Sequence, residues 1–272
     1  MTSPTTLIRA VTVVDGTGES RYTADVELAD GVIRRIARPG SLEPGAADVI
    51  EGAGLVLSPG FIDMHAHSDL QLLIERDHYA KLSQGVTTEL LGQDGLSYAP
   101  VDETSLDLIR KQIAGWNTNP DDFDWDWRTV GEYLDRLDRP DADGQRIATN
   151  AAYLIPQGTL RALVVGFDDR PATADQVAEM QRVIAAGMAE GAIGLSAGLT
   201  YTPGMYAGTA ELEALLTTVG ELGGFFDPHH RSYGKGALEG YAEMIALSRA
   251  TGCPLHLAVA LAVMWRGSVA AS

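Results

Sequence analysis

The sequence is poor in cysteine and in positive charge. Its 272 residues include one cysteine, Cys253, so no disulfide can form within the chain, and a reducing cytoplasm is the expected compartment. The chain has 20 Lys and Arg residues and 37 Asp and Glu residues, which gives a net charge of -17. Because that charge repels polyanions, neither nucleic acid nor an anionic membrane surface is an expected partner.

Long apolar segments are also absent. Residues 1–18 lack the basic region and apolar core of a secretory signal. The apolar run Leu257 to Met264 is far shorter than the roughly 20 residues that a membrane helix needs. With 45% hydrophobic residues, the composition predicts a soluble globular protein of one or two domains.

Two kinds of hydrophobic pattern divide the chain near Pro59. Residues 1–58 hold short alternating runs rich in Val and Ile, each closed by a Gly-containing turn, which predicts a small all-β unit. Residues 59–272 alternate strand-like runs with helical periodicity, which predicts an α/β unit with a parallel sheet. Six strands are expected, near residues 55–63, 86–92, 147–155, 192–197, 224–229 and 254–258.

Helical signals are clearest after residue 170. Thr173 and Gln176 form a capping-box pattern that starts a periodic apolar segment, and Gly191 ends it. Further helices are expected over 209–223 and 238–251. Residues 102–143 interrupt the β/α rhythm and contain three of the four tryptophans. We expect this excursion to be an inserted helical lid with packing aromatics.

Asp63, His65 and His67 stand at alternate positions in an apolar stretch. Side chains two apart on a strand point to one face, so the three should converge, as a zinc site would require. Alone, the pattern is equally compatible with polar side chains at a strand end. Asp94 and His229 also follow predicted strands, and active sites of β/α barrels gather at that end. These positions predict a metal site of His65, His67, Asp94 and His229.

Four other polar residues have mainly structural interpretations. Glu89 lies in mid-strand, where a buried, hydrogen-bonded carboxylate is as plausible as a catalytic one. His230 should face away from its neighbour and act structurally. We expect His78 on the surface and His256 in the core of the sixth strand.

Ser196 lies in a Gly-x-Ser-x-Gly pattern, GLSAG, which is typical of the nucleophile elbow of serine hydrolases. That elbow requires a sharp turn from the strand directly into a helix. Here the following residues are rich in Thr, Pro and Gly, which predicts a loop. The elbow interpretation is therefore disfavoured.

Six segments between residues 11 and 233 belong together: VVDGTG, SPGFIDMHAHSDL, GVTTELLGQDGLSYAP, PQGTLRALVVG, GMAEGAIGLSAGLTYTPGMYA and HHRSY. In this order they resemble the amidohydrolase superfamily, and within it the D-aminoacylase or N-acyl-D-amino-acid deacylase group. The resemblance implies a metal-bearing β/α (TIM-like) barrel with a small β-sandwich. It also implies hydrolysis of N-acyl-D-amino acids to a carboxylate and a D-amino acid.

The same resemblance implies roles for the predicted ligands. His65 and His67 look like the metal ligands of the first barrel strand, and His229 looks like the ligand of the fifth. Asp94 stands where the deacylases commonly have a metal-binding cysteine. A carboxylate can also ligate zinc, so one or two zinc ions are expected.

The resemblance also bears on which residues bind the substrate and transfer the proton. Tyr201 resembles a residue that contacts the substrate's carboxylate, and Arg231 is a candidate substrate partner. A further metal-binding histidine is expected where this chain has Val259. The Asp that acts as general base in the family has no candidate here, so the catalytic residue is unknown.

The expected barrel is incomplete. A β/α barrel has eight strands and about 250 residues, whereas six strands are predicted. The last 14 residues contain no acidic group, although composition predicts about two. We expect a truncation or an altered reading frame near residue 258, weak or absent activity, and self-association through the unfinished sheet edge.

Three other functions stay open. A serine hydrolase using Ser196 would be indifferent to chelators. A cyclic amidase of the same superfamily would differ in substrate. A non-catalytic fragment would bind zinc through His65, His67 and His229 without turnover.

Overall fold

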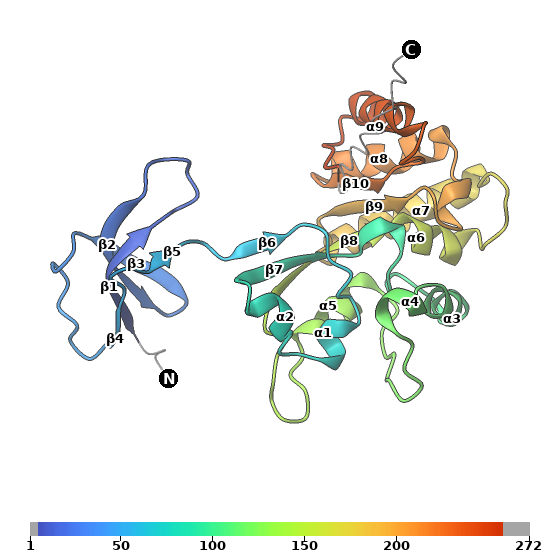
Figure 1. Cartoon of the computed structure of the whole chain (residues 1–272). Coiled ribbons are helices and arrows are strands. Elements are labelled where there is room, and N and C mark those ends of the chain that lie inside the picture. The colour runs from blue at the N-terminus through green and yellow to red at the C-terminus, as the bar shows by residue number, and fades with distance from the viewer. Residues whose placement is uncertain (1–4, 258–272) are drawn as a thin grey trace, which may run out of the picture. The chain divides into compact units, whose positions relative to one another are not determined.

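The structure, a computed structural model, describes residues 5–257 (Figure 1). It divides into two compact units, Met1–Phe61 and Ile62–Ser272. Within residues 5–257, no helix is both long and apolar enough to span a membrane.

The first unit is a five-stranded sheet in which β1 is central. Its strands are β1 (Thr6–Val13), β2 (Tyr22–Ala29), β3 (Val32–Ala37), β4 (Asp48–Glu51) and β5 (Val56–Leu57). β2 pairs antiparallel with both β1 and β3, whereas β4 and β5 lie parallel to β1. Apolar side chains of β1 and β2 form a small core, and the period of two is interrupted between Ile8 and Val11, where the pairing register shifts. The core residues are Ile8, Val11, Val13, Ala24 and Val26.

The second unit is built on a curled sheet of order β10-β9-β8-β7-β6 (Figure 1). Its strands are β6 (Phe61–Asp63), β7 (Val86–Leu91), β8 (Asn150–Pro156), β9 (Gly194–Gly198) and β10 (Phe225–His229). The pairs β7–β8, β8–β9 and β9–β10 are parallel. Each strand neighbours the next in sequence, as right-handed β/α crossovers arrange them. The predicted incomplete β/α barrel is confirmed as a parallel half-barrel.

Two predicted strands differ in detail. The segment 55–63 forms two short strands, β5 and β6, because Pro59 and Gly60 interrupt it, and proline has no N–H to donate to a ladder. At the opposite edge, Leu255 makes a single parallel bridge to Phe226 where the sixth strand was expected. Val259 and the rest of the predicted terminal segment lie outside residues 5–257.

The helices that follow the central strands agree well with the periodicity. They are α6 (Gln157–Val164), α7 (Ala174–Ala189), α8 (Thr209–Glu221) and α9 (Ala237–Thr251), and two short helices, α1 (Gln71–Ile74) and α2 (Tyr79–Leu82), follow β6. Thr173 caps α7, and its hydroxyl accepts a hydrogen bond from the Gln176 N–H, as the capping box predicts.

The excursion between β7 and β8 contains α3 (Glu103–Gln112), α4 (Ala114–Asn117) and α5 (Val130–Asp138). Trp127 is buried there, and its Nε1 donates to the Tyr98 carbonyl at 3.0 Å. The packing role predicted for the excursion's aromatics therefore holds for Trp127. Trp116 differs, because it is 41% exposed.

Candidate metal centre

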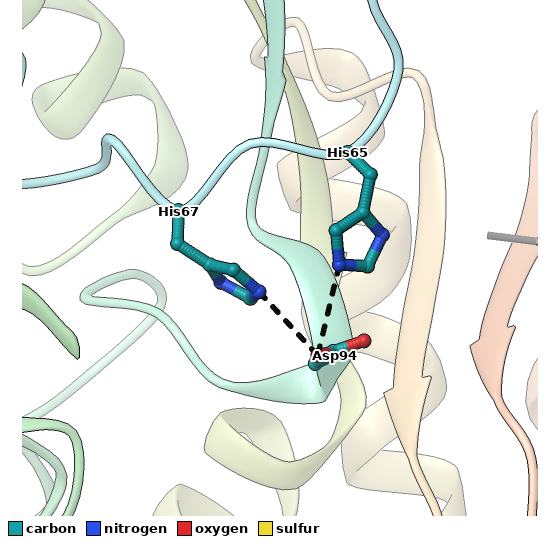
Figure 2. Close-up of side chains that lie close together, drawn as sticks. All are labelled: His65, His67 and Asp94. Atoms are coloured by element: carbon teal, nitrogen blue, oxygen red, sulfur yellow. Dashed lines mark ion pairs between the residues drawn. The ribbon is translucent and has the colours of Figure 1, made fainter. Parts of the chain in front are cut away.

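The four predicted ligands gather at the carboxyl ends of the strands. His65 and His67 follow β6, Asp94 lies in the 3-10 turn η1 (Gln93–Gly95) after β7, and His229 ends β10. His65 Nε2 is 3.7 Å from Asp94 Oδ2, and His67 Nε2 is 3.4 Å from the same oxygen. His229 Nδ1 is 3.5 Å from Asp94 Oδ1. Figure 2 shows both imidazoles of the β6 segment directed at the Asp94 carboxylate.

Asp63 does not join this cluster, so that part of the prediction is wrong. β6 ends at Asp63, and the strand alternation therefore does not extend to the histidines. Asp63 instead accepts a hydrogen bond from the His65 N–H at 3.1 Å and forms an ion pair with Lys81. The carboxylate thus fixes the start of the histidine-bearing segment.

The turn that carries Asp94 requires glycine on both sides. Gly92, Asp94 and Gly95 all have positive φ, at 76°, 54° and 70°. A Cβ on Gly92 would stand 2.0 Å from the Leu154 carbonyl oxygen, and one on Gly95 would stand 2.4 Å from the Gly198 nitrogen. Only glycine permits this close approach, which seats the turn against β8 and β9.

The electrostatics favour an ionised Asp94. Burial raises the pKa of its carboxyl, but the three surrounding imidazoles outweigh burial and hold that pKa well below its usual value. Burial lowers the pKa of His65. Burial also opposes charge on His67, but nearby carboxylates, Asp94 foremost, outweigh it and raise the pKa of His67.

The donor atoms fit a zinc ion. Asp94 Oδ1 and His229 Nδ1, which face each other across 3.5 Å, are both buried without a hydrogen-bond partner among the described residues, although buried polar atoms normally have one. In a tetrahedral zinc site the ligand atoms are about 2.0–2.1 Å from the ion and therefore roughly 3.3 Å apart. The contacts of 3.4–3.7 Å around Asp94 are close to that separation.

Aromatic rings surround the cluster. The ring centroid of Trp116 is 4.8 Å from that of His67 and 5.4 Å from that of Tyr201. Tyr201 in turn lies 4.8 Å from His229, and Tyr233 lies 4.4 Å from His229. Sequence reasoning singled out Tyr201 but missed Trp116 and Tyr233, because nothing in the local pattern places α4 beside the strand ends.

Arg231 is engaged within the protein. Its Nε donates to both carboxylate oxygens of Glu243 at 3.0 Å, and its Nη atoms donate to the carbonyls of Met205 and Ala207. The guanidinium therefore ties the loop after β9 to α9. A role for Arg231 in substrate binding stays a prediction.

Ser196 is not placed as a nucleophile. It is fully buried in the middle of β9, and the chain continues from Gly198 into a loop, as the residues after it predicted. A serine hydrolase elbow would expose the hydroxyl at a helix start. The sequence-based rejection of the elbow is confirmed.

For the remaining polar candidates, the structure agrees with some predictions and contradicts others. Glu89 is buried and accepts hydrogen bonds from Ser68 and Thr149 at 2.7 and 2.9 Å, so it is a satisfied carboxylate. The expectation of a surface His78 is wrong, because its Nδ1 lies 2.8 Å from Glu89 and the residue is buried. The expectation of a core His256 is also wrong, because its side chain is 40% exposed at the sheet edge.

His230 packs against aromatic rings. It is buried, and its ring stacks on Tyr233 with centroids 4.2 Å apart. The structural role predicted for it agrees with this packing.

Comparison with known proteins points to one family. A model of the amidohydrolase family matches residues 48–271. D-aminoacylase from Alcaligenes xylosoxydans xylosoxydans is 33% identical over 254 residues, which are 92% of this chain and 49% of that protein. N-acyl-D-glutamate deacylase from the same organism is 31% identical over 242 residues, 89% of this chain and 46% of that protein. The chain thus spans about half the length of these curated relatives.

Solved structures give the same result. N-acyl-D-glutamate deacylase from Bordetella bronchiseptica, complexed with zinc and a phosphonate mimic of the tetrahedral intermediate, superposes with a TM-score of 0.79 at 31% identity. The match covers 94% of this chain and 51% of that one. A D-aminoacylase structure that addresses a binuclear metal centre has a TM-score of 0.79 at 32% identity, over 93% of this chain and 50% of that one.

Proposed function

The chain belongs to the amidohydrolase family, and on that basis we propose that it binds zinc and acts in the hydrolysis of N-acyl-D-amino acids. The products would be a carboxylate and a free D-amino acid. The relatives named D-aminoacylase and N-acyl-D-glutamate deacylase support this reaction class. The small-molecule substrate agrees with a net charge of -17, which disfavours polyanions.

One observation carries the metal assignment. The carboxylate of Asp94 lies among three imidazoles, and the facing buried atoms Asp94 Oδ1 and His229 Nδ1 have no hydrogen-bond partner within residues 5–257. Leaving such atoms unpaired costs about 1–3 kcal/mol each. We assign His65, His67, Asp94 and His229 as the residues that hold the ion.

When bound, zinc lowers the pKa of a coordinated water towards neutrality and polarises an amide carbonyl. The residues of the chain prepare the site for it. Asp94 is ionised at neutral pH because its pKa is held low, and its negative charge favours a cation. His65, whose pKa is lowered by burial, offers a neutral ring nitrogen.

Tyr201 is suited to orient the substrate. Burial, and then the charge of Asp94, raise the pKa of its hydroxyl, so the proton stays on the oxygen at neutral pH. A protonated phenol can donate a hydrogen bond to the carboxylate of an N-acyl amino acid. Trp116 and Tyr233 pack against the rings of His67 and His229.

The test is zinc binding and turnover by the 272-residue protein. We expect zinc to bind in calorimetry. Any release of D-amino acids from N-acetyl-D-amino acids should be chelator-sensitive, and neither the L-enantiomers nor cyclic amides should be hydrolysed. Hydrolysis that persists in chelator, or the absence of zinc binding, would contradict the proposal. The expectation of weak or absent turnover stays a prediction, and the same assay measures it.

A further inference from the structure

We propose that Ser196 is a positioning residue for Asp94. The Ser196 hydroxyl forms hydrogen bonds to both ends of the turn that presents the metal-binding carboxylate. The inference rests on the proposed metal site. It assigns a role to the GLSAG segment, which the proposed chemistry leaves unused.

The hydroxyl makes two hydrogen bonds to one turn. Its oxygen accepts from the Gly95 N–H at 3.0 Å, and its proton is donated to the Gly92 carbonyl. Gly92 precedes Asp94 by two residues and Gly95 follows it by one. Ser196 is fully buried, so no water competes for either bond. One side chain of β9 therefore holds the backbone on both sides of Asp94.

The turn needs such support because its backbone is unfavourable. Asp94 has φ 54° and ψ 24°, the left-handed region that residues with a Cβ rarely adopt. Asp and Asn tolerate it best, but they do not prefer it. Strained backbone persists when the surroundings over-determine it, and the Ser196 hydroxyl supplies two of the constraints.

Both glycines of the segment allow close backbone packing on β9. A Cβ on Gly198 would stand 2.0 Å from the Asp94 carbonyl oxygen. A Cβ on Gly194 would stand 2.2 Å from the Phe225 carbonyl oxygen. Gly198 therefore lets the turn reach β9, and Gly194 lets β10 approach. Ser196 and Gly198 are thus accounted for by their contacts with the turn of Asp94, and Gly194 by the packing of β10.

Thr159 provides a matched control. It is also fully buried, and its Oγ1 donates to the Ser97 carbonyl at 2.9 Å and accepts from the Ser97 N–H at 3.1 Å. Both hydroxyls thus make one donated and one accepted bond to backbone after β7. Thr159 holds a residue that carries no proposed ligand, whereas Ser196 holds the turn of Asp94.

The experiment measures zinc affinity and the absorption spectrum of bound Co²⁺ in the full chain and in Ser196→Ala and Thr159→Val. We expect Ser196→Ala to weaken zinc binding about 10-fold or more, the size typical of losing a group that orients a ligand. The visible bands of Co²⁺ should shift as its coordination changes. Thr159→Val should bind zinc as the wild type does, even if it unfolds at a lower temperature.

Three results would overturn the proposal. Wild-type affinity and an unchanged Co²⁺ spectrum in Ser196→Ala would show that the hydroxyl serves stability alone. Equal losses in both variants would show a general packing effect. A wild-type protein that binds no zinc would remove the proposed function together with this inference. If Ser196→Ala does not fold, Ser196→Cys, which is close in size but a weaker hydrogen-bonding group, should show the same direction of change.

Discussion

At the residue scale, the centre depends on a single carboxylate. Among the residues that the structure describes, Asp94 is the carboxylate that contacts His65, His67 and His229 together. We expect Asp94→Asn to weaken zinc binding by at least about 100-fold, because losing a ligand costs more than losing a group that orients one. Isothermal titration calorimetry measures this.

Asp63→Asn is the comparison for that variant. The Asp63 carboxylate pairs with Lys81 and accepts a hydrogen bond from the His65 N–H, so it holds the segment of a proposed ligand but does not face the cluster. Zinc affinity should therefore fall less in Asp63→Asn than in Asp94→Asn. Equal losses in Asp63→Asn and Asp94→Asn would argue against Asp94 as a ligand.

Cys253 gives a second test at this scale. The thiol is fully buried, and burial raises its pKa to about 11. Only the thiolate reacts readily with disulfide reagents, and at pH 8 the folded protein keeps the proton on sulfur. We expect slow reaction with a chromogenic disulfide under native conditions and fast, stoichiometric reaction in guanidinium. Fast reaction of the native protein would show that the site around α9 opens freely.

At the scale of elements, a buried ion pair joins α6 to α8. Arg161 and Glu211 are both buried and in contact. Removing one partner leaves the other charge unpaired, so Glu211→Ala should lower the free energy of unfolding by about 3–5 kcal/mol. Urea denaturation measures the loss.

An exposed pair offers the comparison. Lys111 and Asp107 form an i,i+4 pair on the surface of α3. Asp107→Ala should lower the free energy of unfolding by less than about 1 kcal/mol. Similar losses at Asp107 and Glu211 would mean that the buried pair is compensated by rearrangement.

The elements also show what the sequence could reveal. The start of α7 was predictable because Thr173 and Gln176 satisfy each other's backbone within four residues. The clustering of His65 and His67 with Asp94 was predictable from their spacing, but not for the expected reason: the two histidines follow β6 and do not lie on it. His78 was mispredicted because its burial depends on Glu89, which comes from a neighbouring strand. Local pattern carries no such tertiary information.

At the scale of the whole molecule, all four proposed ligands belong to the unit Ile62–Ser272. Zinc should therefore stabilise that unit selectively. A ligand at 100 times its dissociation constant adds about 2.7 kcal/mol. Differential scanning calorimetry with zinc and with chelator should show one transition that shifts and one, from the first unit, that does not. A scan that is identical in both conditions would contradict metal binding by the folded chain.

The half-barrel itself was predictable from the alternation of strand-like and helical segments. Its ends were not, because edge strands are specified by partners more than by their own residues. The single bridge at Leu255 illustrates this. The expected self-association stays a prediction, and light scattering measures it.

The position of Trp116 has an optical consequence. Its indole contacts the ring of His67, so an ion that binds this imidazole alters the surroundings of a natural fluorophore. Zinc titration should change the intrinsic emission of the protein, and Trp116→Phe should abolish most of that change. Emission that is unaltered at saturating zinc would place the ion away from His67. Trp116 is thus an intrinsic fluorescent reporter of zinc binding at His67.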